Sequence, residues 1–252
     1  MPASYTHQCF GDDLIRYMNS DHKTLIKQYK NLFNLGLQGP DLLFYYHPLK
    51  KNRVQDIGIK MHQLPARSFF EESFQFDDDA TLVYLIGFAL HYLLDSRAHP
   101  VINKVTHDDF EHYELERDLD MCFLGDRHPA IMSTAASFIA DEQASKTIGR
   151  VLHITAKEAH KAIKSFRFYN NLVYNEYRDV RMILKKLTAF LHIPFTNMFV
   201  VDKPSTRYVD DVKEVRYWYM IALREAIEIM LQFIDAYYNK KSLSERFDHN
   251  YE

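Results

Sequence analysis

The stretch DDATLVYLIGFALHYLLDSRAH at residues 78–99 constrains the fold more than any other part of this chain. It opens with acidic residues and is strongly apolar afterwards, which is typical of a buried central helix. His91, Asp95 and His99 follow one another at intervals of four. Each such step advances a helix by about 40°, so the three side chains share one face. Because buried polar groups without partners cost several kcal/mol, these residues need partners, and a metal ion would be one.

Helical periodicity extends along almost the whole sequence. Apolar residues recur at helical spacing, and only seven glycines and eight prolines interrupt 252 residues. No internal repeat or shift in composition marks a domain boundary, so we predict one all-α, multi-helix domain spanning residues 1–252. One helix is predicted to begin near Asp56 and to bend or end at Pro65. The other helices are predicted at 12–18, 22–37, 78–99, 106–124, 133–146, 155–165, 169–191 and 209–239.

Two residues define the predicted helix ends around His99. Pro100 disfavours helical geometry in the residue before it, so His99 is predicted at or just past the end of the central helix. The next helix, 106–124, is predicted to take Thr106 as its N-cap, because a threonine hydroxyl can accept a hydrogen bond from a free backbone N–H there.

Composition and charge exclude several classes of protein. The formal net charge of −3 and the pI of about 6.5 give no overall signature for binding nucleic acid or an anionic membrane. No run of 18 apolar residues predicts a transmembrane helix, and the N-terminus lacks the pattern of a signal peptide. Two cysteines, Cys9 and Cys122, do not make a disulfide framework. These features predict a reduced, cytoplasmic protein.

The segment HDDFEHYELER, which starts at residue 107, contains two overlapping pairs at the helical i, i+4 spacing. His107 pairs with Glu111, and His112 pairs with Glu116. Either pair would place an imidazole and a carboxylate on one helical face, where both can reach the same ion. Taken alone, such a pair is more often a surface or core hydrogen bond.

Three residues upstream add further ligand types. Asp41 follows a Gly-Pro turn in QGPD, His62 lies among apolar residues in KMHQLP, and His7 lies in THQ. Alone, Asp41 is an ordinary turn residue and His62 a satisfied core histidine. Together with the HxxxDxxxH run and an HxxxE pair, they form a mixed set of histidines and carboxylates that suits zinc. We therefore predict a metal centre within residues 7–120.

The order of these motifs resembles that of the zinc-dependent phospholipase C family. This family includes bacterial phosphatidylcholine-cleaving enzymes and the catalytic domain of a clostridial toxin, and secreted single-strand nucleases share its all-α fold. Its pattern is an Asp after a short turn, a His near a helix start, HxxxDxxxH, and then HxxxE or HxxxD. GPD, MH, HYLLDSRAH and HDDFE match this pattern in order and in approximate spacing. Residues 121–252 match only in length and helical character.

The resemblance implies ligands for clustered metal ions. A first ion would be held by four residues: Asp41, His62, His91 and Asp95. The toxin-type continuation of the motif favours the first HxxxE pair over His112 and Glu116, so a second ion would be held by His99, His107 and Glu111. Zinc is the implied metal, at two or three ions per chain, with manganese or iron as alternatives. Asp41 would also orient or deprotonate the attacking water.

The third metal site of the family depends on an N-terminal tryptophan. That residue binds through its amine and carbonyl, together with a His that matches His7 and the Asp that matches Asp95. Only six residues precede His7 here and none is Trp, so only His7 and Asp95 carry over. The acidic residue that helps to cage choline in a secreted member would lie before Met1, so we do not expect choline specificity.

The activity implied by the resemblance is that of a metal-dependent phosphodiester hydrolase, in which a metal-activated water attacks a phosphoester. The expected partner is a phosphodiester or a phospholipid-like small substrate, and nucleic acid is not expected. The alternative is an intracellular member of the family that binds metal but hydrolyses little, and that has a regulatory or binding role. Metal content and activity on phosphodiesters distinguish the two.

Overall fold

The computed structural model of the chain describes residues 4–127 and 138–251. Every regular element within these ranges is helical, which confirms the predicted all-α fold. Across the same residues, no helix combines the length and apolar composition needed to cross a bilayer. The elements are α1 (Ser4–Tyr17), α2 (Ser20–Gln28), α3 (Lys30–Gly36), η1 (Gly39–Tyr45), α4 (Arg53–Gln63), α5 (Ala66–Ser73), α6 (Asp79–Val105), α7 (Asp109–Arg127), α9 (Glu142–Val151), α10 (Ala156–Val173), α11 (Arg178–Phe190), η2 (Pro194–Met198), α12 (Val209–Asn239) and η3 (Glu245–Asp248).

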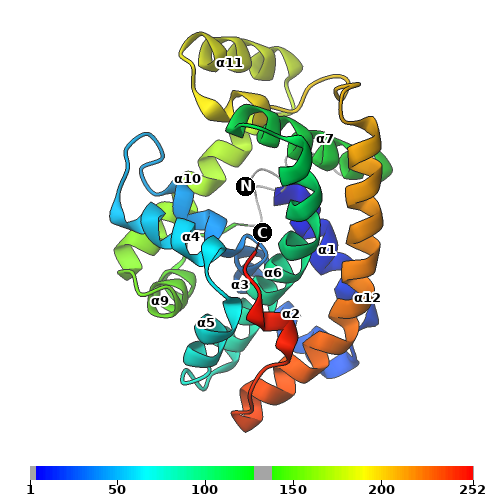
Figure 1. The fold of residues 1–252 in the computed structure, drawn as a ribbon. Coiled ribbons are helices and arrows are strands. Elements are labelled where there is room, and N and C mark those ends of the chain that lie inside the picture. The colour runs from blue at the N-terminus through cyan, green and yellow to red at the C-terminus, as the bar shows by residue number, and fades with distance from the viewer. Residues whose placement is uncertain (1–3, 128–137, 252) are drawn as a thin grey trace.

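Helix α6 runs through the centre of the molecule, and the other helices pack around it (Figure 1). All of its residues from Thr81 to Asp95 are buried, as expected for a helix that is apolar on every side. Helix α3 approaches α6 closely because two glycines, Gly36 and Gly87, face each other. A Cβ atom on Gly36 would lie 2.2 Å from the carbonyl oxygen of Tyr84. The central helix therefore supplies a rigid, buried platform for its polar residues.

Pro100 does not end the central helix, contrary to the sequence-based expectation. Helix α6 continues through Pro100 to Val105, so His99 lies inside the helix. A proline inside a helix costs about 3 kcal/mol. Val101 and Ile102 beyond it are buried, and each contributes about 1.5–3 kcal/mol by leaving water. Burial of these two side chains therefore offsets the cost of the proline.

The helix after α6 begins later than predicted. Thr106 is the C-cap of α6, where its backbone N–H donates to the carbonyl of Ile102, and is not the N-cap of the following helix. Helix α7 begins at Asp109, and the carboxylate of Asp108 accepts from the backbone N–H of Glu111 at 2.9 Å. Aspartate is at least as good an N-cap as threonine, so the start moves towards Asp108.

Two predicted helices are each divided in two. The region 22–37 forms α2 and α3, which meet at Tyr29, and the region 169–191 is interrupted between α10 and α11. In the second break, the side chain of Asn175 accepts from the backbone N–H of Tyr177 at 3.0 Å, a local turn that competes with helix. Of the predicted helix 133–146, residues 133–137 lie outside the described part of the chain.

Candidate metal centre

Histidine and carboxylate side chains from five helical elements gather around α6. Helix α6 supplies three of them at its predicted i, i+4 spacing, and α1, η1, α4 and α7 supply the others. They form three groups, each with ligand atoms within 4.8 Å of one another: His7, His91 and Asp95; Asp41, His62 and His91; and His99, His112 and Glu116.

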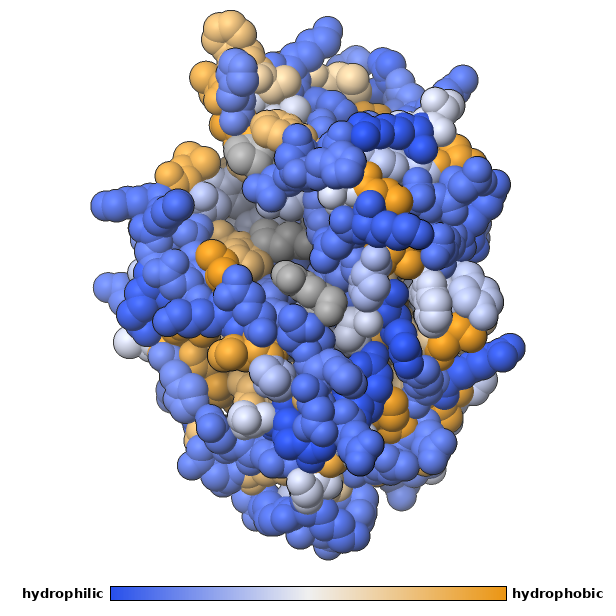
Figure 2. Space-filling view, viewed as in Figure 1, coloured by the Kyte–Doolittle hydropathy of each residue, from blue (hydrophilic) through white to orange (hydrophobic). Residues whose placement is uncertain are grey.

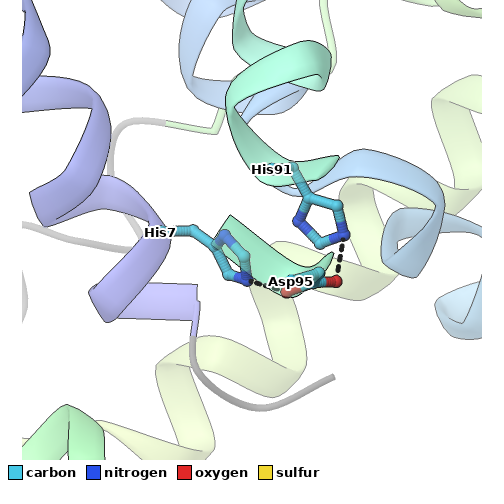
Figure 3. Close-up of side chains that lie close together, drawn as sticks. All are labelled: His7, His91 and Asp95. Atoms are coloured by element: carbon cyan, nitrogen blue, oxygen red, sulfur yellow. Dashed lines mark ion pairs between the residues drawn. The ribbon is translucent and has the colours of Figure 1, made fainter. Parts of the chain in front are cut away.

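In the first group, Asp95 lies between two imidazoles (Figure 3). His7 Nε2 is 3.1 Å from Asp95 Oδ1, and His91 Nε2 is 2.9 Å from Asp95 Oδ2. The two rings stack with their centroids 4.2 Å apart, and all three residues are buried. Each carboxylate oxygen of Asp95 therefore faces one histidine. This arrangement is the one expected if Asp95 takes part in two adjoining metal sites.

The second group adds Asp41 and His62 on the other side of His91. His62 Nε2 is 3.1 Å from Asp41 Oδ1, and both side chains are largely buried. Asp41 is brought here by the turn at Gly39, which has a positive φ of 51°. A Cβ atom on Gly39 would lie 2.2 Å from the imidazole of His91, so the close approach requires glycine.

Gly39→Ala is expected to displace His91 and weaken metal binding by the second group. The added methyl overlaps the ring of His91, and alanine is strained at a φ of 51°. We expect a lower melting temperature and a fall of more than about tenfold in metal affinity, as for loss of a ligand-orienting contact. Gly125→Ala is the matched control, because a methyl group added there would meet no atom within 4 Å. Equal metal affinity in both variants would contradict this role for Gly39.

The third group combines His99 on α6 with a histidine and a glutamate on α7. His112 Nε2 is 3.2 Å from Glu116 Oε1, and His99 Nε2 is 3.6 Å from the same oxygen. His99 and Glu116 are buried, whereas His112 is partly exposed. This group supplies two of the residues, His99 and His112, that line the cavity described below.

The predicted pair His107 and Glu111 is not part of this group. His107 is exposed, and Glu111 accepts from the backbone N–H of His107 at 2.9 Å and pairs with Arg207 at 2.7 Å. His112 and Glu116, the competing pair, take the place beside His99. The two pairs are five residues apart, which turns a helix by about 140°, so only one of them can face α6.

Three imidazoles of the cluster are oriented by backbone carbonyls. The Nδ1 atoms of His62, His91 and His99 lie 2.8, 3.2 and 3.0 Å from the carbonyl oxygens of Gly58, Leu37 and Tyr251, respectively. A carbonyl only accepts, so each Nδ1 carries a proton, and Nε2 is the nitrogen that can offer a lone pair to a metal ion. The Nε2 atoms of His91 and His99 face carboxylate oxygens of Asp95 and Glu116 but make no well-aligned hydrogen bond with the described residues.

This pattern fits divalent metal ions. Metal-ligating histidines commonly donate the N–H of their second nitrogen to a carbonyl or carboxylate, which fixes the tautomer and aims the first nitrogen. Buried nitrogen lone pairs and carboxylate oxygens then converge in groups of three, the number of protein ligands typical of a catalytic zinc.

The electrostatics of the cluster favour positive charge. Burial alone would lower the pKa of His99, but the carboxylates of Asp95 and Glu116 raise it to about 9. Burial opposes ionisation of Asp95, yet the surrounding histidines hold its pKa well below the usual range. Such a site stabilises protons or metal ions, and the two compete for the same nitrogen atoms.

A segment from the far end of the chain completes the cluster. Residues 243–251 return to the centre of the molecule after α12 (Figure 1). The backbone N–H of Tyr251 donates to the carbonyl of His62 at 3.2 Å, and its carbonyl accepts from His99. Arg67 on α5 holds the segment by donating to Asp248 at 2.9 Å and to the carbonyl of Ser244 at 3.1 Å. Nothing in the sequence pattern indicates this contribution from Tyr251.

A cavity of about 520 Å³ lies beside the third group. Its lining includes His62, His99 and His112 and is otherwise mainly apolar and aromatic. No lysine or arginine lines it within the described part of the chain. A largely apolar cavity that contacts a few convergent polar groups is typical of a ligand site.

Comparison with known protein families shows the family of the chain. The family described as zinc dependent phospholipase C matches residues 6–181, which is well over half of the chain. No curated protein and no solved structure matches the chain. The matched region contains all three groups of histidines and carboxylates. The chain therefore belongs to the zinc-dependent phospholipase C family.

Proposed function

We propose that this chain is a metal-dependent phosphodiester hydrolase that acts on a phospholipid-like substrate. The observation that carries the proposal is the set of three adjoining donor groups, two of which share His91. Bound divalent ions in such an arrangement polarise phosphoryl oxygens, lower the pKa of water and stabilise the leaving oxygen. Zinc is the metal that the family membership supports.

The donor groups suggest how many ions the chain binds. Asp41, His62 and His91 would hold one ion, and His99, His112 and Glu116 would hold a second. His7 and Asp95 would contribute to a third, with Asp95 placed between His7 and His91. We therefore propose two or three ions per chain.

Asp41 is the proposed general base. Burial opposes its ionisation, but its pKa is lowered, and the hydrogen bond from His62 and the charge of His91 are among the causes. It is therefore a carboxylate at neutral pH, able to orient a water molecule and accept its proton. The turn at Gly39 holds it within reach of His62, so its position is fixed before substrate binds.

The cavity supports a substrate with an apolar part. Phe44, Tyr113 and Phe195 are among its lining residues, and the cavity meets the donor groups at His99 and His112. An acyl or aryl group in the cavity would leave the phosphate beside those groups. The absence of basic residues from the described lining does not favour a polyanionic substrate.

Elemental analysis followed by a substrate panel tests the proposal. The protein, purified without chelators, is expected to carry at least two zinc ions per chain and to hydrolyse bis-(p-nitrophenyl) phosphate or a phospholipid. A chelator should abolish hydrolysis and added zinc should restore it. Less than one ion per chain, after incubation with zinc, manganese or iron, would refute the metal centre. A metal-loaded but inactive protein would favour the alternative of a metal-binding family member with a regulatory role.

A further inference from the structure

Helix α11 exposes its apolar side, the reverse of an ordinary helix in a globular protein. Val180, Ile183, Leu187 and Phe190 recur at i, i+3, i+7 and i+10, so they lie along one side of the helix. All four are exposed, with 65 % of Ile183 and 80 % of Phe190 accessible to solvent. A contiguous exposed stripe of this kind marks an interaction surface.

The inward side of α11 is polar and is held by specific contacts. Arg181 is buried, and its Nε donates to the carbonyl of Val200 at 2.9 Å while Nη1 donates to the carbonyl of Asn175. Thr188, seven residues further on and on the same side of the helix, is also buried. The hydrogen bonds of Arg181 to residues outside α11 hold this side inward, so the apolar stripe faces outward.

The stripe adjoins a segment that lines the cavity beside the metal centre, because α11 packs against η2. After α11, the chain runs into Ile193, Phe195 and Met198, which all line that cavity. From another part of the chain, Leu49 and Ile59 also line it, and 75 % of Leu49 is exposed. Figure 1 shows α11 projecting at the top of the molecule, and Figure 2 shows apolar residues in orange at the same place. Exposed apolar residues therefore flank the cavity mouth.

Positive charge accompanies these apolar residues. Lys186 on α11 is exposed, as are Lys50 and Lys51 beside Leu49. Arg178, by contrast, pairs with Asp202 at 2.5 Å. These three lysines outnumber Asp179, the exposed carboxylate on α11, although the net charge of the whole chain is −3. Exposed apolar residues accompanied by exposed lysines are typical of a surface that lies in the interface of an anionic membrane.

We propose that α11 and the rim of the cavity form a docking surface for an anionic lipid bilayer. The choice of a lipid surface over a second protein rests on the proposed function, because a phospholipid-like substrate must leave a bilayer to reach the metal centre. With the stripe in the interface, an acyl chain passes from the bilayer into the cavity without crossing water. The lysines contact the anionic head groups, whose charge they complement.

A vesicle-binding experiment with matched variants tests this surface. The probes are vesicles of equal parts phosphatidylcholine and phosphatidylglycerol, compared with vesicles of phosphatidylcholine alone. The test variant combines Ile183→Ser with Phe190→Ser. The control combines Tyr217→Ser with Leu231→Ser, two exposed residues on α12 that do not line the cavity. Both variants are also assayed for metal content and for hydrolysis of soluble bis-(p-nitrophenyl) phosphate.

The full-length, metal-loaded wild-type protein is expected to bind the anionic vesicles and to bind phosphatidylcholine vesicles more weakly. The test variant should lose about 100-fold in vesicle affinity, since two large apolar side chains no longer enter the interface. The control should bind like the wild type, and soluble hydrolysis should be unchanged in both.

Three results would overturn the docking surface. These are wild-type protein that fails to bind either vesicle, equal binding by the test variant, and a wild-type dimer that the test variant converts to a monomer. Vesicle binding that depends on α11 in a protein inactive on every phosphodiester would refute the proposed function alone and leave the docking surface supported.

Discussion

Asp41→Asn is expected to lower turnover about 100- to 10,000-fold, the usual contribution of a general base. The amide has the size of the carboxylate, so the turn at Gly39 and the fold should persist. Its oxygen can still coordinate metal, although more weakly, but it cannot accept a proton at neutral pH. The measurement is kcat on bis-(p-nitrophenyl) phosphate, with metal content and melting temperature determined on the same sample.

Asp109→Asn is the matched control for this experiment. Asp109 is a carboxylate that lines the cavity but belongs to none of the three donor groups, so its variant should turn over normally. A loss of activity in Asp41→Asn that only follows a loss of metal would make Asp41 a ligand without a role as base. Full metal, normal melting and normal turnover would remove Asp41 from the mechanism.

Glu116→Gln is expected to weaken binding of one zinc ion by more than about 100-fold. Replacing a residue that merely orients a ligand costs about 10- to 100-fold in metal affinity, and loss of a ligand charge should cost more. Glu116 is buried with an oxygen 3.2 Å from His112 Nε2. Zinc stoichiometry and competition with a chromophoric chelator measure the effect.

Glu111→Gln distinguishes the two HxxxE pairs. Glu111 pairs with Arg207 and caps the start of α7, so its variant should retain all metal and lose only a little stability. A selective loss of zinc in Glu111→Gln, with none in Glu116→Gln, would restore the pair that the sequence motif favoured. Equal losses in both variants would contradict the arrangement of the third group.

The sequence predicts the part of the site that depends on local periodicity. His91, Asp95 and His99 share a face of α6 because helical spacing alone determines it. The choice between His107 with Glu111 and His112 with Glu116 depends instead on how α7 crosses α6. Both pairs have the same spacing, so tertiary packing decides between them. The resemblance to the family's HxxxE motif favoured His107 and Glu111, the pair that does not lie beside His99.

Contacts through the backbone leave no trace in a single sequence. The carbonyl of Tyr251 orients His99 across 152 residues of chain, and any residue at position 251 would present a carbonyl. The sequence likewise does not reveal which way the apolar side of α11 faces. Its apolar period is the same whether Ile183 and Phe190 face the core or the solvent, so periodicity predicts the helix but not the direction of its apolar face.

The central claim is that the buried histidines and carboxylates around α6 form a metal centre. Anomalous diffraction from crystals of zinc-loaded protein, recorded on both sides of the zinc absorption edge, tests it most directly. We predict one peak among Asp41, His62 and His91 and a second among His99, His112 and Glu116, with any third between His7 and Asp95. A map with no anomalous peak at these residues, or with its peaks at His107 and Glu111, would contradict the account.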